Sequence, residues 1–200
     1  MKARHRRRRR VAVAVLVVVA GVSAGLLLGV VGKVDQAIQE LTLPLRHEDI
    51  IRQQASDKEI DPALIAAVIY EESRFRDQTS HAGAKGLMQL LPSTAHDIAR
   101  KSGGTAFIEG DLANPQVNIS YGSFYLRYLL RRYGGNEVLA IAAYNAGEGR
   151  VDQWIFDARH KGEAFDRARH IPFPETGHYV QQVLDVRTRY REEYGRELGL

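Results

Sequence analysis

Cysteine is absent from all 200 residues of the chain. This absence excludes disulfides, a thiol nucleophile, a cysteine-bound zinc site and a lipid-modified cysteine, so a folded domain must be stable through its core alone. The histidines, among them His81, His96 and His178, lack the spacing of a zinc hydrolase, in which two histidines one helical turn apart accompany a glutamate. We therefore expect neither a metal nor any other cofactor.

Strict alternation of apolar and polar residues, which is typical of half-buried strands, is also missing. Internal repeats and low-complexity domains are absent as well. The length allows one compact domain with an appendage. The sequence therefore predicts a mostly α domain, which we place at residues 50–200.

Outside the N-terminus, basic residues do not outnumber acidic ones. The first ten residues hold seven of the 28 Lys and Arg and no acid, which leaves 21 basic against 24 acidic residues, a net charge of about −3, for residues 11–200. Nothing after Lys33 combines basic residues with interleaved aromatics, the usual footprint of a nucleic-acid interface. We expect no nucleic-acid binding, and we interpret residues 1–10 as a basic cytoplasmic tail.

One long apolar run is present, at residues 11–32. Its length is near the ~20 residues that a helix needs to cross a bilayer, and the preceding arginines predict a cytoplasmic N-terminus. We expect a single transmembrane anchor, a stalk at residues 33–49 and a domain on the far side of the membrane. A cleaved signal peptide is the alternative, since Val22-Ser23-Ala24 faintly resembles a cleavage site.

Asp61-Pro62 predicts the start of a helix, with aspartate as the N-cap and proline in the first turn. An apolar stripe follows with helical spacing: Leu64, Ile65, Val68 and Ile69, continued by Glu72 and Phe75. Desolvation of an acid on such a stripe raises its pKa, so that it can give a proton near neutrality and take one back. An exposed acid at a helix end is the alternative interpretation of Glu72.

Breaks and apolar spacing predict four further helices: one from Pro92 to about residue 101, one from Pro115 that stops at Gly134-Gly135, one at residues 138–144 that ends at Gly147, and one from Glu175 to Tyr190. The short apolar helix at 138–144 is expected at the centre of the fold. Residues 152–169 form a polar, charge-rich stretch, and 171–174 are expected to be extended.

Four separated motifs occur in order: Glu72-Ser73; Ser80 with Gly83-Ala84 and Gly86-Leu87-Met88-Gln89; Ala143-Tyr144-Asn145-Ala146-Gly147; and Glu175-Thr176 with Tyr179-Val180. Together they resemble the lytic murein transglycosylases of the soluble-lytic-transglycosylase (family 1) type, whose α fold is lysozyme-like and related to goose-type lysozyme. The resemblance covers about residues 50–190. It implies that the substrate is the glycan strand of peptidoglycan, cleaved without water at the β-1,4 bond between N-acetylmuramic acid and N-acetylglucosamine to leave 1,6-anhydromuramoyl ends.

The resemblance implies that Glu72 is the catalytic residue. Glu72 would protonate the glycosidic oxygen, and the N-acetyl carbonyl of the substrate would take the place of a second carboxylate. Glu72 would then deprotonate the 6-hydroxyl for ring closure. Glu71 is the adjacent rival, but neighbours on a helix face about 100° apart and cannot share one site.

The resemblance also assigns substrate contacts. Ser80 and Gln89 would contact N-acetyl or hydroxyl groups, Met88 would line the floor of the cleft, and Tyr144 and Asn145 would lie across it, with the tyrosine hydroxyl orienting the acid or the intermediate. Each residue also has a structural alternative. Met88 could fill the core, Ser80 could serve a turn and Gln89 could cap a helix. Tyr144 could pack in the core, and Asn145 could form a C-cap.

In the last motif, the resemblance implies that Glu175 holds the cleft and that Tyr179 packs nearby. Between Glu72 and Ser80 this chain is one residue shorter than the usual family pattern, so Ser80 is expected to lie differently. Two further functions remain as alternatives: a muramidase of the same fold that uses water, and a non-catalytic module that binds peptidoglycan.

Overall fold

Helices form nearly all the regular structure that the computed structural model describes, which comprises residues 39–103, 107–166 and 170–200. Residues 45–200 make up one compact unit, whose start lies close to the expected domain boundary at residue 50. The expected basic tail and membrane anchor lie outside the described residues. Among the helices that are described, none has the length and apolar character needed to span a bilayer.

Helix α3 (Pro62–Ser73) is the most deeply buried helix of the unit. It begins as predicted, because Asp61 Oδ1 accepts a hydrogen bond from the Ala63 amide at 3.0 Å and Pro62 lies in the first turn. Residues 63–69 are each at most 1% exposed, so the helix is buried on all sides rather than along one stripe. Phe75 has a φ of 58° and lies beyond the end of the helix, so it does not continue the predicted stripe.

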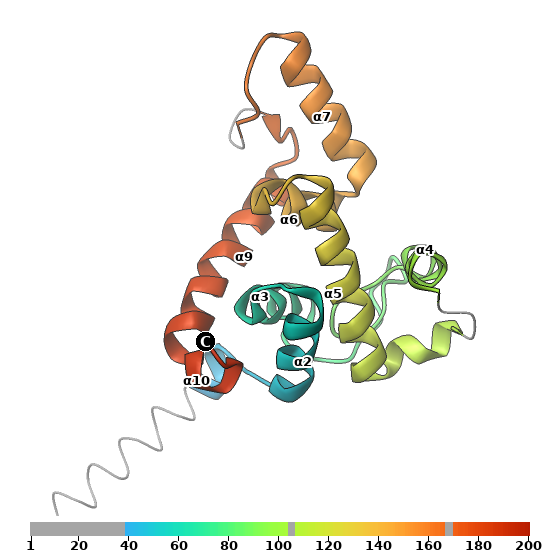
Figure 1. Ribbon diagram of the computed structural model, residues 1–200, viewed down its shortest axis with the longest axis vertical. Helices are drawn as coiled ribbons and strands as arrows, with labels where there is room; N and C mark the ends of the chain where they lie inside the picture. Colours follow the sequence, from blue (N-terminus) through green and yellow to red (C-terminus); the bar gives the residue numbers. More distant parts are fainter. Residues whose placement is uncertain (1–38, 104–106, 167–169) are drawn as a thin grey trace, which may run out of the picture. The chain divides into compact units, whose positions relative to one another are not determined.

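Four helices surround α3: α2 (Glu48–Lys58), α5 (Pro115–Arg132), α6 (Glu137–Ala146) and α9 (Pro174–Glu193). α3 packs along α9, α2 packs against both α3 and α5, and α6 packs against α5 and α9 (Figure 1). The side chain of Asn114 caps α5 by accepting from the Gln116 amide, and that of Asn136 caps α6 by accepting from the Leu139 amide. Local capping chemistry therefore fixes where these helices start.

Between α3 and α5 lie α4 (Pro92–Ser102) and a short 3-10 helix, η1 (Glu109–Ala113). α4 begins at Pro92 as predicted and ends at Gly103, which has a φ of 79°. The segment before α4 has two isolated antiparallel bridges, from Lys85 to Thr79 and to Leu90. These bridges close a tight loop beside the end of α3.

Helix α7 (Glu148–His160) occupies part of the stretch that the sequence marked only as polar and charge-rich. It buries only Val151, Trp154 and Ala158, which lie on one side, and apart from the half-buried Ile155 its other residues are polar or exposed. The chain ends with α10 (Gly195–Leu198), which contacts α2 and α9.

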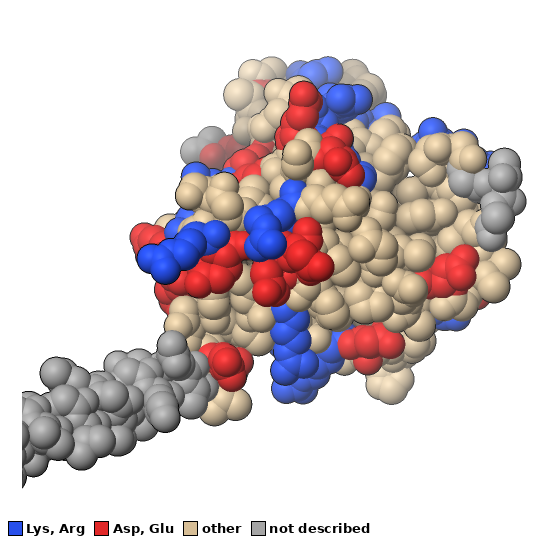
Figure 2. All heavy atoms as spheres, turned by 60° about the horizontal axis from the view of Figure 1, so that its bottom comes forward, with Lys and Arg blue, Asp and Glu red and all other residues tan. Residues whose placement is uncertain are grey.

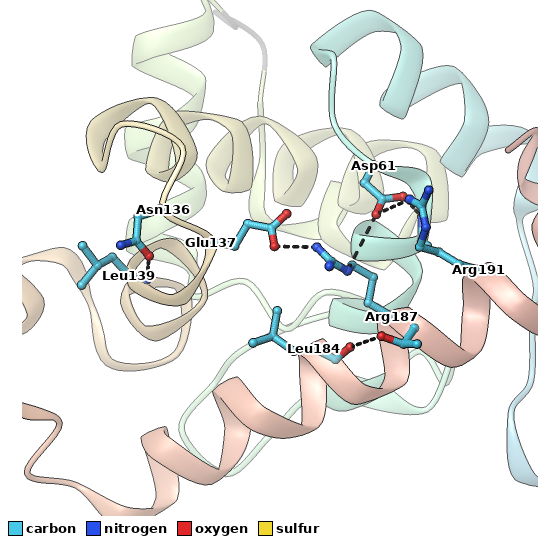
Figure 3. Close-up of polar contacts among 9 residues, drawn as sticks. Asp61, Asn136, Glu137, Leu139, Leu184, Arg187 and Arg191 are labelled. Carbon is cyan, nitrogen blue, oxygen red and sulfur yellow. Dashed lines mark hydrogen bonds and ion pairs between the residues drawn. The ribbon is translucent and has the colours of Figure 1, made fainter. Parts of the chain in front are cut away.

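Charged side chains connect the helices at their surfaces. Figure 2 shows Lys and Arg side chains next to Asp and Glu side chains on one face of the molecule. Figure 3 shows one such network: Arg187 on α9 bonds Glu137 at 2.5 Å, and Arg191 bonds Asp61 at 2.9 Å. Arg187 also lies 3.9 Å from Asp61. The network therefore joins the starts of α3 and α6 to the C-terminal half of α9.

Candidate active site

An open pocket of about 480 Å³ lies where the end of α3, the loop before α4, and the junction of α6 and α7 meet. Five of the eight predicted site residues line it: Glu72, Ser80, Gln89, Tyr144 and Asn145. The structure thus brings together side chains from three of the four sequence motifs. The roles of these residues are still predictions.

Glu72 lies in the last turn of α3, where the buried helix reaches the pocket. The pKa of Glu72 is raised from its ordinary value of 4.5 to about 7, mainly by burial and to a smaller extent by the nearby charge of Glu71. The hydroxyl of Tyr179, on the first turns of α9, donates a hydrogen bond to Glu72 Oε1 at 2.6 Å. This hydrogen bond lowers the pKa of Glu72, because it favours the ionised carboxylate. Near neutral pH the carboxyl group is therefore divided between its acid and its base form.

Glu71 faces elsewhere. It is 3.5 Å from Arg74 in an ion pair and is not among the residues that line the pocket. Burial raises its pKa, while the charges of Arg74 and His178 lower it. The geometry therefore distinguishes the two adjacent glutamates, and Glu72 is the one that the pocket contains.

The end of α3 is held to the next loop by Ser73. Its hydroxyl is buried and lies 3.1 Å from the Ile69 carbonyl and 2.7 Å from the Leu87 carbonyl. Arg74 follows with a φ of 54°, so the chain leaves the helix directly after Ser73. This contact fixes Glu72 relative to the loop on the other side of the pocket.

Asn118, on α5, organises that loop and was not predicted. It is fully buried, its Oδ1 accepts from the Met88 amide at 2.7 Å, and its Nδ2 donates to the carbonyls of Lys85 and Leu112 at 3.0 Å each. A Cβ on Gly86 would lie only 2.1 Å from Asn118 Nδ2, and Gly86 has a φ of 77°, so glycine is required there. No local pattern marks Asn118, because its partners are distant in sequence.

The predicted loop residues take different positions. Met88 is fully buried below the pocket and does not line it; a Cβ on Gly122 would meet its sulfur at 2.2 Å. Ser80 lines the pocket, and its hydroxyl accepts from the Ala84 amide within the turn. Gln89 has a φ of 47°, and its Nε2 donates to the carbonyls of Gln78 and Gly86.

Across the pocket, the Tyr144 hydroxyl donates to the Met88 carbonyl at 2.9 Å. Tyr179, expected to pack nearby, is the tyrosine that contacts Glu72. Burial raises the pKa of both tyrosine hydroxyls, which keeps them protonated as donors at neutral pH. Tyr144 therefore supports the loop in this structure, whereas Tyr179 directly contacts the acid.

Asn145 is held by a residue that the sequence analysis did not assign. The buried Thr176 hydroxyl donates to Asn145 Oδ1 at 2.9 Å, which leaves the amide nitrogen of Asn145 free to face the pocket. Glu175 is exposed in the first turn of α9 and is not among the pocket-lining residues. In the described part of the chain, no group of three or more His, Cys, Asp or Glu is placed to hold a metal.

The family model described as the transglycosylase SLT domain matches residues 49–165. The chain belongs to this family. The soluble lytic murein transglycosylase of Escherichia coli (strain K12) is 35% identical over 164 residues, which cover 81% of this chain and 25% of that protein. The sequence prediction of the family is thus confirmed.

Solved structures of this SLT family show the same fold. The lytic transglycosylase Slt of Pseudomonas aeruginosa, solved as an inactive mutant with glutamine in place of a glutamate, is 36% identical with a TM-score of 0.68, and the match covers 78% of this chain and 26% of that one. The 70 kDa soluble lytic transglycosylase of Escherichia coli is 34% identical with a TM-score of 0.71, covering 80% and 26%. These likenesses confirm the expected mostly α, lysozyme-like fold. This chain spans about a quarter of the length of these relatives.

Proposed function

We propose that this chain is a peptidoglycan lytic transglycosylase that cleaves the β-1,4 bond between N-acetylmuramic acid and N-acetylglucosamine. The observation that carries the proposal is the state of Glu72, the one carboxylate among the described residues that line the pocket, whose pKa is about 7. A single acid of this kind suits a reaction in which the same group first gives and then takes a proton. Family membership and the inactive glutamine mutant of the Pseudomonas relative support it.

In the proposed reaction, protonated Glu72 gives its proton to the glycosidic oxygen as the bond to the anomeric carbon breaks. The N-acetyl carbonyl oxygen of the muramoyl residue bonds to that carbon and forms an oxazolinium intermediate. The 6-hydroxyl then attacks the same carbon and displaces the carbonyl oxygen, while Glu72 takes the hydroxyl proton. The Tyr179 hydroxyl stabilises the carboxylate between the two steps, because hydrogen bonds to an ionised acceptor are the stronger ones.

Product analysis tests this function. The purified 200-residue chain is incubated with isolated peptidoglycan, and the soluble fragments are analysed by mass spectrometry. A lytic transglycosylase releases anhydromuramoyl ends, lighter by one water than the reducing ends that a muramidase releases. Reducing ends would replace our proposal with the muramidase, and strand binding without any release would replace it with the non-catalytic module.

Replacing Tyr179 with phenylalanine is expected to lower the maximal rate about tenfold, since a hydrogen bond to a charged group contributes about 1.5–3 kcal/mol. The pKa of Glu72 should rise, because the lost hydrogen bond favours the ionised form. The alkaline limb of the pH–rate profile should therefore move to higher pH. Tyr133→Phe is the matched control, because Tyr133 donates to Asp152 outside this pocket. An unchanged profile for Tyr179→Phe would contradict the role of Tyr179.

Replacing Thr176 with valine, which has nearly the same shape, is expected to reduce kcat/KM about tenfold by releasing the Asn145 amide from its fixed orientation. Thr176→Ser keeps the hydroxyl and should retain most of the activity. Steady-state kinetics on soluble glycan fragments measure the effect, with thermal unfolding as a control for folding. Equal activity of the valine and serine variants would contradict this positioning role.

We further propose that residues 11–32 anchor the chain in the cell membrane as a single span, with residues 45–200 outside the cytoplasm. The lack of cysteine makes this testable, since any introduced cysteine is the only one in the chain. In intact spheroplasts, Lys161→Cys is expected to react with a membrane-impermeant maleimide, and Ala3→Cys is expected to react only after lysis. Release of the domain into the medium would instead indicate a cleaved signal peptide.

A further inference from the structure

The pocket contains one cation in addition to its acid. Of the described residues that line it, only Glu72 and Arg150 carry charged side chains. Arg150 lies in the first turn of α7, the helix that the sequence analysis missed, and it is exposed to solvent. The pocket therefore offers a proton donor from α3 and a guanidinium from α7.

Arg150 differs from the arginines that join the helices. Arg127, Arg132 and Arg187 each contact a carboxylate at about hydrogen-bond distance, whereas Arg150 has no acidic partner within ion-pair distance in the described part of the chain. Its contacts are a long hydrogen bond of 3.4 Å to the Ala146 carbonyl and a position 5.6 Å from the centre of the Phe173 ring. Its charge is therefore free to bind an anion.

The same contacts hold the guanidinium at the pocket. Phe173 is 40% exposed, and its ring centre lies 5.8 Å from that of the buried Trp154, against which it packs in a tilted arrangement. A guanidinium within about 6 Å of an aromatic ring is attracted to it and loses less freedom on binding than one without such a contact. Ala146 and Gly147 line the pocket beside Arg150.

We propose that Arg150 binds a carboxylate carried by the muramoyl residue of the glycan and thereby sets the register of the strand. This inference rests on the proposed function. Peptidoglycan alternates N-acetylglucosamine, which has no charge, with muramic acid, whose lactyl carboxyl group is free or linked to a peptide with carboxylates of its own. A guanidinium binds a carboxylate through two parallel hydrogen bonds. Because only every second sugar offers this group, Arg150 selects which of the two alternating β-1,4 bonds lies at Glu72.

Binding measurements with the Glu72→Gln variant test the inference without cleavage. Three ligands are compared by calorimetry: glycan fragments with peptides, the same fragments after an amidase has removed the peptides, and N-acetylglucosamine oligomers of equal length. Arg150→Met is added to the Glu72→Gln variant, which keeps an aliphatic side chain at position 150 but removes its charge. It is expected to weaken binding of carboxylate-bearing fragments by tenfold or more at low salt and to leave N-acetylglucosamine oligomers unchanged. Arg150→Lys should show a smaller loss.

Arg159→Met is the matched control, because Arg159 is exposed on the same helix but does not line this pocket. A loss confined to peptide-bearing fragments identifies a peptide carboxylate, and a loss that extends to the amidase-treated fragments identifies the lactyl group. Equal binding by the Arg150→Met variant and its parent, or an equal loss for the uncharged oligomers, would overturn the inference. If Arg150→Met weakened binding as expected but the unsubstituted chain did not cleave peptidoglycan, the proposed function would be overturned and the inference about Arg150 would stand.

Discussion

Glu72→Gln is expected to lower kcat/KM on peptidoglycan by about 10³-fold or more, because it removes the group proposed to act as acid and then as base. The glutamine fills the same space, so the fold and the affinity for glycan should persist. Glu71→Gln is the matched control, since that residue neighbours Glu72 but does not line the pocket. Near-parental cleavage by Glu72→Gln would refute the proposed chemistry.

The same substitution should increase stability in a pH-dependent way. The folded chain holds a proton on Glu72 up to about pH 7, whereas the unfolded chain releases it near 4.5. The contribution of Glu72 to the free energy of unfolding is therefore fully present below pH 4.5 and is lost as the pH rises through 7. The difference between the two limits is about 3 kcal/mol. Glu72→Gln lacks this loss and should be more stable than the parent at pH 8.

Denaturant unfolding of both chains between pH 4 and pH 8 measures this difference. The gap in unfolding free energy between Glu72→Gln and the parent should widen across that range. If the unfolding free energies of the two chains changed with pH in parallel, Glu72 would have an ordinary pKa. The raised pKa on which the proposed function depends would then be refuted.

Asn118→Ala is expected to destabilise the chain by about 4 kcal/mol. It leaves the Met88 amide and the Lys85 and Leu112 carbonyls without their buried partner, and each such group costs about 1–3 kcal/mol. Activity should fall together with stability, because these bonds hold the loop that lines the pocket. Gln116→Ala, at an exposed position on the same helix, should change stability by less than about 0.5 kcal/mol. Chemical denaturation compares the two, and a cost below about 1 kcal/mol for Asn118→Ala would show that water replaces its contacts.

Features set by neighbouring residues were predictable from the sequence. The Asp61 cap, the helix starting at Pro115 and the end of α6 at Gly147 depend on contacts within a few residues, and the structure has them where they were expected. Helix α7 was missed because its three buried residues are too few to mark an apolar stripe within a charged stretch.

Contacts between distant residues carried no local signal. Asn118 contacts Met88 across 30 positions, Thr176 contacts Asn145 across 31, and Tyr179 contacts Glu72 across 107. The motifs indicated that Tyr179 belongs near the site, but not that its hydroxyl would bond the acid. The sequence therefore predicted the family and five of the residues that line the pocket, whereas the hydrogen bonds that orient them required the folded chain.

The ion pairs of Asp61, Glu137, Arg187 and Arg191 lie at the starts of α3 and α6, while Glu72 and Tyr144 lie near the ends of the same helices. Twelve helical residues such as those of α3 span about 18 Å, roughly twice the Debye length of about 8 Å at physiological ionic strength. At that ionic strength the charges of the network are largely screened at Glu72, so substitutions within the network are expected to change how α3 and α6 attach to α9 without changing the pKa of the acid.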